Sequence, residues 1–329
     1  FRARDGPALH SVHVTHGSGA RIEDYRAPLL FAWQVTNRCT GRCLHCCEES
    51  GPDKAWPGEL NREESLDLAR QVADMAVPYA SFGGGEPLGA PHIWEVFDIL
   101  AKAGVEIKIE TNGLLIGEKE ADRLKGLGSP CVQISVDGAT AATHEKVRPE
   151  GPFAPAVEAI RRLVRRGLHV EFVFVPTRLN LQEIHPAYDL ARELGAGAFV
   201  TGPMMRLGRA AADYARLAPE PADWSAAAAG LEARSKGNPT RLSMYPWDII
   251  EEVRRRRESP QAMVLVVPDG HVKLLNALPF SAGNVRQKKL AEIWERVPSV
   301  WRGAAVQDFS GRLLEDPGLL RHANECWPA

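Results

Sequence analysis

The sequence lacks a long hydrophobic run. Its longest candidate, 262–267, has the length of a strand, whereas a membrane-spanning helix needs about 20 apolar residues. The N-terminal segment 1–25 is polar and rich in histidine, without the apolar core of a signal peptide. His10, His13 and His16 do not share the two-residue spacing of one strand face, so we predict no metal site there. We expect no membrane partner.

A strong excess of charge of one sign is also missing. The chain has 40 Lys and Arg against 42 Asp and Glu, a formal net charge of -2, which disfavours general binding to nucleic acid. The one dense basic run, 254–257, follows a helical pattern and is interpreted as a solvated helix end. A phosphate-bearing partner is the alternative for this run.

Cysteine is scarce, with 6 in 329 residues, which is too few for a disulfide scaffold. Four of them crowd between Cys39 and Cys47, whereas Cys131 and Cys326 stand alone. Such crowding is typical of a metal site in a reducing cytoplasm. The hydrophobic content of 44% is sufficient for a sizeable core, so we expect a globular protein.

Short apolar runs alternate with amphipathic helical patterns over most of the first two thirds of the chain. This alternation is typical of repeated βα units around a parallel sheet. The predicted strands are 29–35, 77–82, 105–110, 131–136, 168–175 and 197–201. Because six units cannot close an eightfold barrel, we predict an α/β fold with an open, partial (β/α)6 TIM-like barrel. The active site then belongs at the carboxyl ends of the strands.

Helix ends can also be predicted. Asn61 and Glu64 have the spacing of a capping box at the start of one helix. Gly104 and Gly167 follow amphipathic stretches and are expected to end helices in the left-handed conformation.

A change in composition suggests a domain boundary. Residues 216–240 are rich in Pro, Ala, Gly and Ser, as in a connector or a poorly packed helix. Beyond them, Asp269-Gly270 predicts a two-residue hairpin turn, and 288–297 predicts a helix. We therefore divide the chain into an N-terminal segment (1–25), a barrel core (26–215), a connector (216–240) and a small α+β C-terminal appendage (241–329).

The loop after the first predicted strand contains CxxxCxxC, formed by Cys39, Cys43 and Cys46. This spacing lets one loop present three thiolates to a single metal centre. A structural zinc site normally uses four ligands in two separated pairs, and no second pair is present. Three thiolates suit a [4Fe-4S] cluster with one iron left open, although a zinc protein remains an alternative.

The motif and its position after the first of six βα units resemble the radical S-adenosylmethionine (SAM) superfamily. The resemblance implies that Cys39, Cys43 and Cys46 bind three irons of a [4Fe-4S] cluster and that SAM binds the fourth. It also implies reductive cleavage of SAM to a 5'-deoxyadenosyl radical, which removes a hydrogen atom from the substrate. His45 lies where the family carries an aromatic residue near the adenine, and Cys47 is interpreted as a bystander thiol.

Loops after later strands extend the resemblance. The segment 83–87 reads Gly-Gly-Gly-Glu-Pro, similar to the family's motif for the SAM amino group, and consecutive glycines permit close approach of a ligand. The resemblance implies ribose contacts from the polar ends of the third and fourth strands and a carboxylate contact from an arginine. The candidate SAM-binding residues are His45, Gly84, Gly85, Glu86, Thr111, Asn112, Ser135, Asp137 and Arg148. Asn180 and Arg206 are further candidates in strand-end loops.

The C-terminal appendage resembles the SPASM or twitch extension of the same superfamily, but without its cysteines. Leu275 and Asn276 stand where the extension has a cysteine, and none occurs between Cys131 and Cys326. We therefore expect a degenerate extension with no auxiliary cluster. Without this electron acceptor, redox-neutral rearrangement, epimerisation, decarboxylation or bond formation is favoured over dehydrogenation. Cys326 is a candidate hydrogen donor to a substrate radical.

Together these features predict a cytoplasmic, single-cluster radical SAM enzyme. Its substrate would be a peptide or a small natural-product or cofactor precursor, and flavodoxin or ferredoxin would supply electrons. The alternative from another class is a noncatalytic iron-sulfur binding or sensing protein that acts through a partner.

Overall fold

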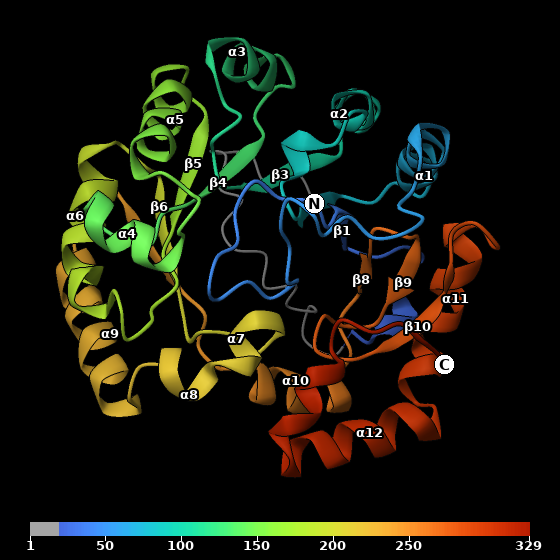
Figure 1. The fold of residues 1–329 in the computed structure, drawn as a ribbon. Coiled ribbons are helices and arrows are strands. Elements are labelled where there is room, and N and C mark those ends of the chain that lie inside the picture. The colour runs from blue at the N-terminus through green and yellow to red at the C-terminus, as the bar shows by residue number, and fades with distance from the viewer. Residues whose placement is uncertain (1–19) are drawn as a thin grey trace.

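A computed structural model describes residues 20–329. His10, His13 and His16 lie outside the described residues. Figure 1 shows helices around the outside of a curved sheet, with the loop after the first strand crossing the middle of the view. No helix within residues 20–329 combines the length and apolar character needed to cross a bilayer.

All six predicted strands form. They are β1 (Leu30–Thr36), β2 (Tyr79–Gly84), β3 (Glu106–Thr111), β4 (Cys131–Ser135), β5 (His169–Val173) and β6 (Ala198–Thr201). Each pairs in parallel with the next. The sheet is therefore the one expected from the alternation of apolar runs and helical patterns.

The sheet extends beyond these strands at both ends. β7 (Arg241–Met244) pairs in parallel with β6, and β8 (Met263–Val266) pairs in parallel with β1. The 11-stranded sheet has the order β11-β10-β9-β8-β1-β2-β3-β4-β5-β6-β7, and its ends do not pair within the described part of the chain. The predicted open, partial barrel is confirmed, and the strands of the C-terminal region continue its sheet.

The C-terminal hairpin differs from the prediction at its turn. β8 is followed by β9 (His271–Lys273), β10 (Phe280–Asn284) and β11 (Trp327–Pro328). The predicted two-residue turn at Asp269-Gly270 is wrong, because Val267 N donates to His271 O at 3.0 Å and encloses three residues, 268–270. Pro268 can occupy the first of these positions, and only Gly270 has a positive φ, +88°.

The helices on the outside of the sheet follow the predicted pattern. The α-helices are α1 (Arg62–Asp74), α2 (Ile93–Lys102), α3 (Glu118–Gly126), α4 (Ala141–Val147), α5 (Phe153–Arg165), α6 (Ile184–Glu193), α7 (Gly208–Ala212), α8 (Tyr214–Leu217), α9 (Pro221–Ser235), α10 (Ile249–Glu258), α11 (Leu290–Trp301) and α12 (Ala304–Glu315). Short 3-10 helices are η1 (Ile22–Asp24), η2 (Pro87–Gly89), η3 (Leu181–Glu183) and η4 (Pro317–His322).

The predicted helix ends are confirmed. Asn61 Oδ1 accepts from Glu64 N at 3.0 Å, and Glu64 Oε2 accepts from Asn61 N at 2.8 Å, which completes the capping box of α1. Gly104 follows α2 with φ +78°, and Gly167 follows α5 with φ +68°.

Two other predictions concern the region after β6. Most of the predicted connector forms α9, a helix rich in alanine whose one buried residue is Leu231. The domain boundaries at 216–240 stay a prediction. The basic run 254–257 lies at the end of α10, but its interpretation as a solvated helix end is wrong for Arg256, which is buried and pairs with Glu252.

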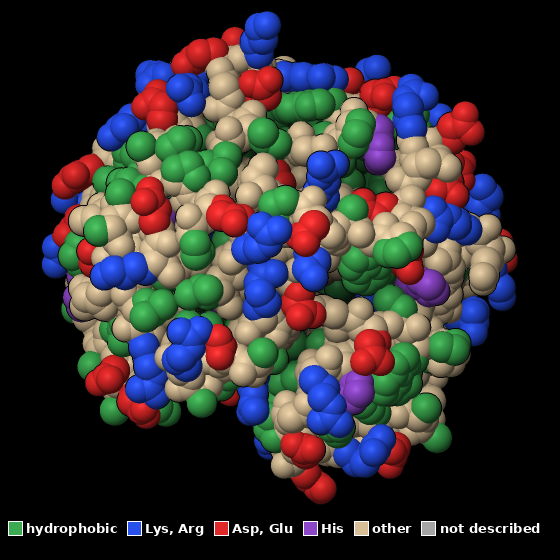
Figure 2. All heavy atoms as spheres, viewed as in Figure 1, with side chains coloured by type: hydrophobic (Ala, Val, Ile, Leu, Met, Phe, Trp, Pro, Cys, Tyr) green, Lys and Arg blue, Asp and Glu red, His purple; other side chains and the backbone are tan. Residues whose placement is uncertain are grey.

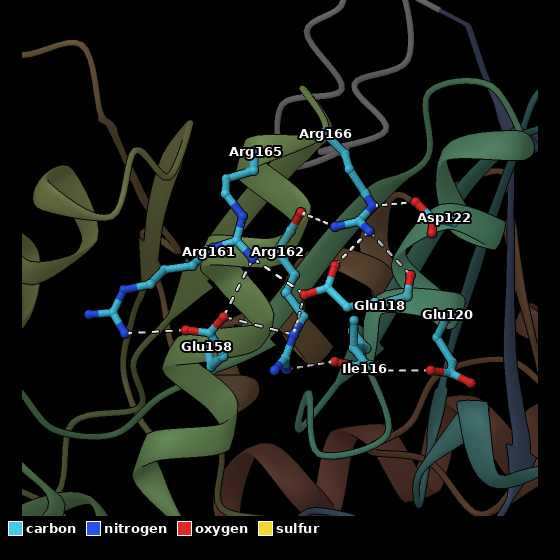
Figure 3. Close-up of polar contacts among 10 residues, drawn as sticks. Ile116, Glu118, Glu120, Asp122, Glu158, Arg161, Arg162, Arg165 and Arg166 are labelled. Atoms are coloured by element: carbon cyan, nitrogen blue, oxygen red, sulfur yellow. Dashed lines mark hydrogen bonds and ion pairs between the residues drawn. The ribbon is translucent and has the colours of Figure 1, made fainter.

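Ion pairs join the outer helices at the surface (Figure 3). Glu118 of α3 pairs with Arg162 and Arg165 of α5 and with Arg166, which directly follows α5; Arg166 also pairs with Asp122. Glu118 and Asp122 are exposed, so we expect a small contribution to stability. On the face shown in Figure 2, acidic and basic side chains are intermixed.

The strands separate an apolar face from a polar one. Alternating residues such as Ile107, Ile109 and Ile134 are buried in the hydrophobic core beneath the helices. The residues between them, such as Lys108 and Gln133, lie on the inner face of the curved sheet, where Lys108 donates to Glu171. A polar interior bounded by the loops at the strand ends is the setting for the candidate site.

Candidate active site

The three cysteines of the CxxxCxxC motif lie in the loop that follows β1. This loop closes on itself where Cys39 N donates to Gly51 O at 3.0 Å. All three thiols are free and only partly buried. Burial raises the pKa of Cys46 to about 11 and also raises that of Cys39, so these thiols are protonated at neutral pH until a metal displaces the proton.

Each of the three sulfurs has an N–H donor beside it. Arg148 Nη1 lies 3.5 Å from Cys43 Sγ, Ser50 N lies 3.4 Å from Cys46 Sγ, and Asn112 Nδ2 lies 3.9 Å from Cys39 Sγ. Hydrogen bonds to sulfur stabilise the charge of metal-bound thiolates in iron-sulfur proteins. Three unpaired thiols in one loop, each with a donor, are chemically suited to a [4Fe-4S] cluster with one open iron.

The glycines at the end of β2 pack against the start of this loop. A Cβ on Gly85 would lie 2.1 Å from Arg38 O, and one on Gly84, where φ is +106°, would lie 2.6 Å from Thr36 O. Gly85 N donates to Thr36 O at 2.7 Å. The absence of side chains at Gly84 and Gly85 therefore lets the ends of β1 and β2 approach each other closely.

Glu86 is buried, and its carboxylate connects two strand-end loops. It accepts from Thr111 Oγ1 at 2.7 Å, from Asn112 N at 3.0 Å and from Leu88 N at 3.2 Å. Burial raises the pKa of Glu86 despite these hydrogen bonds. Because three protein donors already bind this carboxylate, Glu86 holds Thr111 and Asn112 in position.

Asn112 then extends from β3 to the cysteine loop. Its Nδ2 donates to Thr40 Oγ1 at 2.9 Å in addition to facing Cys39, while its Oδ1 accepts from Leu114 N at 2.9 Å. The structure thus brings the predicted residues Glu86, Asn112 and Cys39 into one connected group.

Asp137, Arg148 and His45 form a second buried group at the same edge. Asp137 Oδ2 lies 2.6 Å from Arg148 Nε and 3.3 Å from His45 Nε2. Burial alone would raise the pKa of Asp137, but Arg148 and then His45 hold it below its usual range. Burial lowers the pKa of His45 to about 4, so its ring is neutral at neutral pH. The guanidinium of Arg148 is therefore the buried cation that lies beside Cys43.

The remaining candidates lie around these groups. Ser135 is half-buried at the end of β4, two residues before Asp137. Asn180 is buried and donates to Asp137 O at 3.1 Å and to Val175 O at 3.0 Å, so it orders the neighbouring loops. Arg206 lies over the ring of Tyr214, with 5.2 Å from its guanidinium carbon to the ring centroid.

The other cysteines occupy three different places. Burial raises the pKa of Cys47 well above its ordinary value. Cys131 is buried at the start of β4, away from the strand ends that carry the candidate site. Cys326 lies beside Asp269 and His271, in a C-terminal segment whose Asn324 donates to Cys47 O at 3.0 Å.

One residue that the sequence did not indicate supports the cysteine loop. Arg209, in α7, donates from Nε to Cys43 O at 2.9 Å and from Nη2 to Ser50 O at 2.8 Å. The adjacent Gly208 has φ +51°, and a Cβ there would lie 2.2 Å from Cys47 O. In the sequence, the only sign of this role was that Gly208 and Arg209 follow soon after the last predicted strand.

Comparisons with known proteins agree with this architecture. The family model of the Radical SAM superfamily matches residues 33–191. The chain is 37% identical over 176 residues to mycofactocin maturase MftC of Mycobacterium ulcerans (strain Agy99), a match that covers 53% of this chain and 47% of that relative. The chain thus spans about half the length of this relative.

A second relative matches over most of both chains. The AdoMet-dependent heme synthase of Methanosarcina barkeri (strain Fusaro / DSM 804) is 27% identical over 323 residues, covering 91% of this chain and 90% of the relative.

Among solved structures, Streptococcus suis SuiB bound to S-adenosylmethionine has a TM-score of 0.71 over 87% of this chain and 69% of that chain. At 14% identity this likeness shows the fold alone. The family match and the relatives thus place residues 33–191 in the radical SAM superfamily, whose cofactors are a [4Fe-4S] cluster and SAM.

Proposed function

We propose that this enzyme reductively cleaves SAM at a single [4Fe-4S] cluster and abstracts a hydrogen atom from a peptide. The observation that carries the proposal is the set of three unpaired thiols in one loop, each with an N–H donor. When bound, the cluster and SAM supply the electron and the 5'-deoxyadenosyl radical. The protein contributes ligands, orientation and exclusion of water.

The candidate residues take distinct roles in this proposal. Cys39, Cys43 and Cys46 bind the irons. Arg148 places a fixed positive charge at the cysteine loop and orients the SAM carboxylate, while Asp137 holds the guanidinium in place. The backbone at 84–86 binds the SAM amino group.

The other candidates act around the nucleoside in this proposal. Asn112 and Ser135 face the ribose, and the neutral ring of His45 lies against the adenine. Glu86 and Thr111 are positioning residues, since they bind each other and the backbone of the next loop.

A peptide substrate is supported by two relationships. The relative with 37% identity is a mycofactocin maturase, and a solved structure of SuiB contains its precursor peptide SuiA. A tetrapyrrole is the second candidate, because the heme synthase of M. barkeri matches this chain over 90% of its own length.

The sequence of the C-terminal region supports one cluster and a redox-neutral outcome. No cysteine lies between Cys131 and Cys326, so an auxiliary cluster lacks ligands there. Rearrangement, epimerisation, decarboxylation or bond formation is then favoured. Burial raises the pKa of Cys326 to about 11, which keeps its S–H bond intact as a candidate hydrogen donor. All six cysteines are free, which supports a cytoplasmic setting. We propose flavodoxin or ferredoxin as the electron donor there.

Anaerobic reconstitution followed by reduction with dithionite in the presence of SAM tests the proposal. We expect about four irons per chain and release of 5'-deoxyadenosine. The variant with Cys39→Ala, Cys43→Ala and Cys46→Ala should do neither, whereas the adjacent control Cys47→Ala should retain both. Transfer of deuterium from a labelled peptide into 5'-deoxyadenosine would identify the substrate class, and transfer from a labelled tetrapyrrole would favour the second candidate.

Two results would reject the proposal. A protein that binds iron but never cleaves SAM would be the noncatalytic alternative, acting through a partner. One that binds zinc at the three cysteines in place of iron would be the structural alternative.

A further inference from the structure

A second group of metal-binding side chains lies on the inner face of the sheet, at the opposite ends of the strands from the cysteine loop. Cys131 begins β4 and is paired with His169, which begins β5. Glu171 follows two residues later on the same face. One ligand atom of each of these three residues lies within 4.8 Å of the other two.

Glu171 has one oxygen fully engaged and the other without a partner. Its Oε2 accepts from Lys108 Nζ at 2.9 Å and from Gln133 Nε2 at 2.9 Å. Its Oε1 is buried and has no hydrogen-bond partner, and the same is true of His169 Nε2. These two atoms are 3.9 Å apart, too far for a hydrogen bond. Unpaired buried polar atoms are costly and rare. These two atoms therefore indicate a site at which a ligand would bind both of them.

The spacing is close to that of a metal site. Bonds of about 2.0–2.3 Å in a tetrahedral zinc centre place neighbouring ligand atoms roughly 3.3–3.6 Å apart. The separation of 3.9 Å between His169 Nε2 and Glu171 Oε1 needs a movement of a few tenths of an ångström to match. Lys108 and Gln133 hold the carboxylate from its other oxygen, as supporting groups around metal ligands commonly do.

The position of the histidine ring is also determined by its surroundings. A Cβ on Gly197 would lie 2.6 Å from His169 Cε1, so the ring fills the space that a side chain at position 197 would take. The side chain of His169 is 24% exposed, which provides a path for a metal ion. The sheet thus supplies three ligands, one of which is a carboxylate held in place, and access from solvent.

We propose that Cys131, His169 and Glu171 bind a Zn²⁺ ion, separately from the iron-sulfur site. A water molecule would complete four-coordination. Burial and Glu171 raise the pKa of the Cys131 thiol to about 12 in the metal-free protein. Binding therefore releases the thiol proton to solvent, with no change of oxidation state, and Lys108 keeps its bond to the other oxygen of Glu171.

The test uses the full chain with His271→Gln, which removes the imidazole of the other candidate metal cluster, formed by Asp269, His271 and Cys326. After iron and sulfide reconstitution, Zn²⁺ is added, unbound metal is removed, and zinc and iron are measured separately. We expect one zinc per chain with iron unchanged. Adding Cys131→Ser or His169→Gln should abolish zinc retention while iron and SAM cleavage persist, so this result is independent of the proposed function.

A matched variant keeps all three ligands and moves one. Gly197→Ala displaces the ring of His169 and should weaken Zn²⁺ affinity about 10–100-fold. Co²⁺ added to an unreconstituted chain with Cys39→Ala, Cys43→Ala and Cys46→Ala should give thiolate-to-cobalt charge-transfer absorption that Cys131→Ser removes. The proposal fails if the reconstituted chain without any substitution retains no zinc, because that result does not depend on the folding of a variant. It also fails if a folded Cys131→Ser chain binds zinc unchanged.

Discussion

Arg148 and Asp137 form an ion pair that is almost completely removed from solvent. Arg148 Nε and Asp137 Oδ2 are 2.6 Å apart, and the two side chains are 11% and 0% exposed. The same guanidinium lies 3.5 Å from Cys43 Sγ. The pair therefore connects the loop after β4 to the cysteine loop after β1.

Asp137→Asn tests the strength of this connection. Removing the carboxylate leaves a buried guanidinium without its counter-charge, which costs about 3–5 kcal/mol in comparable pairs. We expect urea unfolding at a markedly lower midpoint and reduced iron after reconstitution. The matched control is Glu95→Gln, which breaks the exposed pair with Arg62 and should change little. Equal midpoints for both variants would show that the buried pair does not stabilise the fold.

Gly85→Ala should damage the cysteine loop through sterics alone. Its Cβ would lie 2.1 Å from Arg38 O, so the backbone before Cys39 must move. We expect a loss of about 1–3 kcal/mol in unfolding free energy, as for other overpacked sites, together with lower iron content. Gly126→Ala is the control, because nothing lies within 4 Å of a Cβ there. At the end of α3 that change should be neutral or stabilise by up to about 1 kcal/mol, and normal iron content in Gly85→Ala would contradict the packing role.

Arg209→Gln removes two hydrogen bonds from a guanidinium to carbonyl groups of the cysteine loop. Charged hydrogen bonds of this kind contribute about 1.5–3 kcal/mol each, so the loop should hold its geometry less well. Iron and sulfide per chain after reconstitution should fall. Arg206→Gln serves as the control, because its ring contact with Tyr214 does not involve the loop. If both variants take up iron like the parent, Arg209 does not organise the loop.

The fold was predictable where side-chain periodicity reports burial. The six strands have apolar runs because helices cover one of their faces. β7 escaped prediction because its sequence, Arg-Leu-Ser-Met, has no such run and gains its place by pairing with β6. The hairpin turn was predicted one residue too short because Pro268 belongs to the turn rather than to the strand.

The candidate site was predictable as a set of loops, because the carboxyl ends of parallel strands meet at one edge. The sequence does not reveal which polar atoms are already hydrogen-bonded within the protein and which are available to a ligand. Glu86 was predicted to contact SAM, and the role stays a prediction, yet its carboxylate binds Thr111 and the backbone of the next loop. Arg209 was not predicted, because its hydrogen bond to Cys43, 166 residues away, depends on the tertiary fold.

Glu171 links the stability of the metal-free protein to pH. Burial would raise its pKa, but His169 and Lys108 lower it from the ordinary 4.5 to about 2. Because the folded state then binds this proton less readily than the unfolded chain, the charge stabilises the fold above about pH 4.5. That stabilisation, at most about 3 kcal/mol, is lost as the pH falls toward 2. Urea midpoints measured from about pH 6 to about pH 3 with a chelator present should decline less steeply in Glu171→Gln than in the parent.

Glu106 provides a control of opposite sign. It lies at the start of β3, where burial raises its pKa, so Glu106→Gln should not reduce the decline in acid. If Glu171→Gln declined as steeply as the parent, Glu171 would not be the group that titrates. The acid sensitivity would then have to come from another buried carboxylate whose pKa is lowered, and Asp137 is the next candidate because Arg148 and His45 hold its charge in the same way.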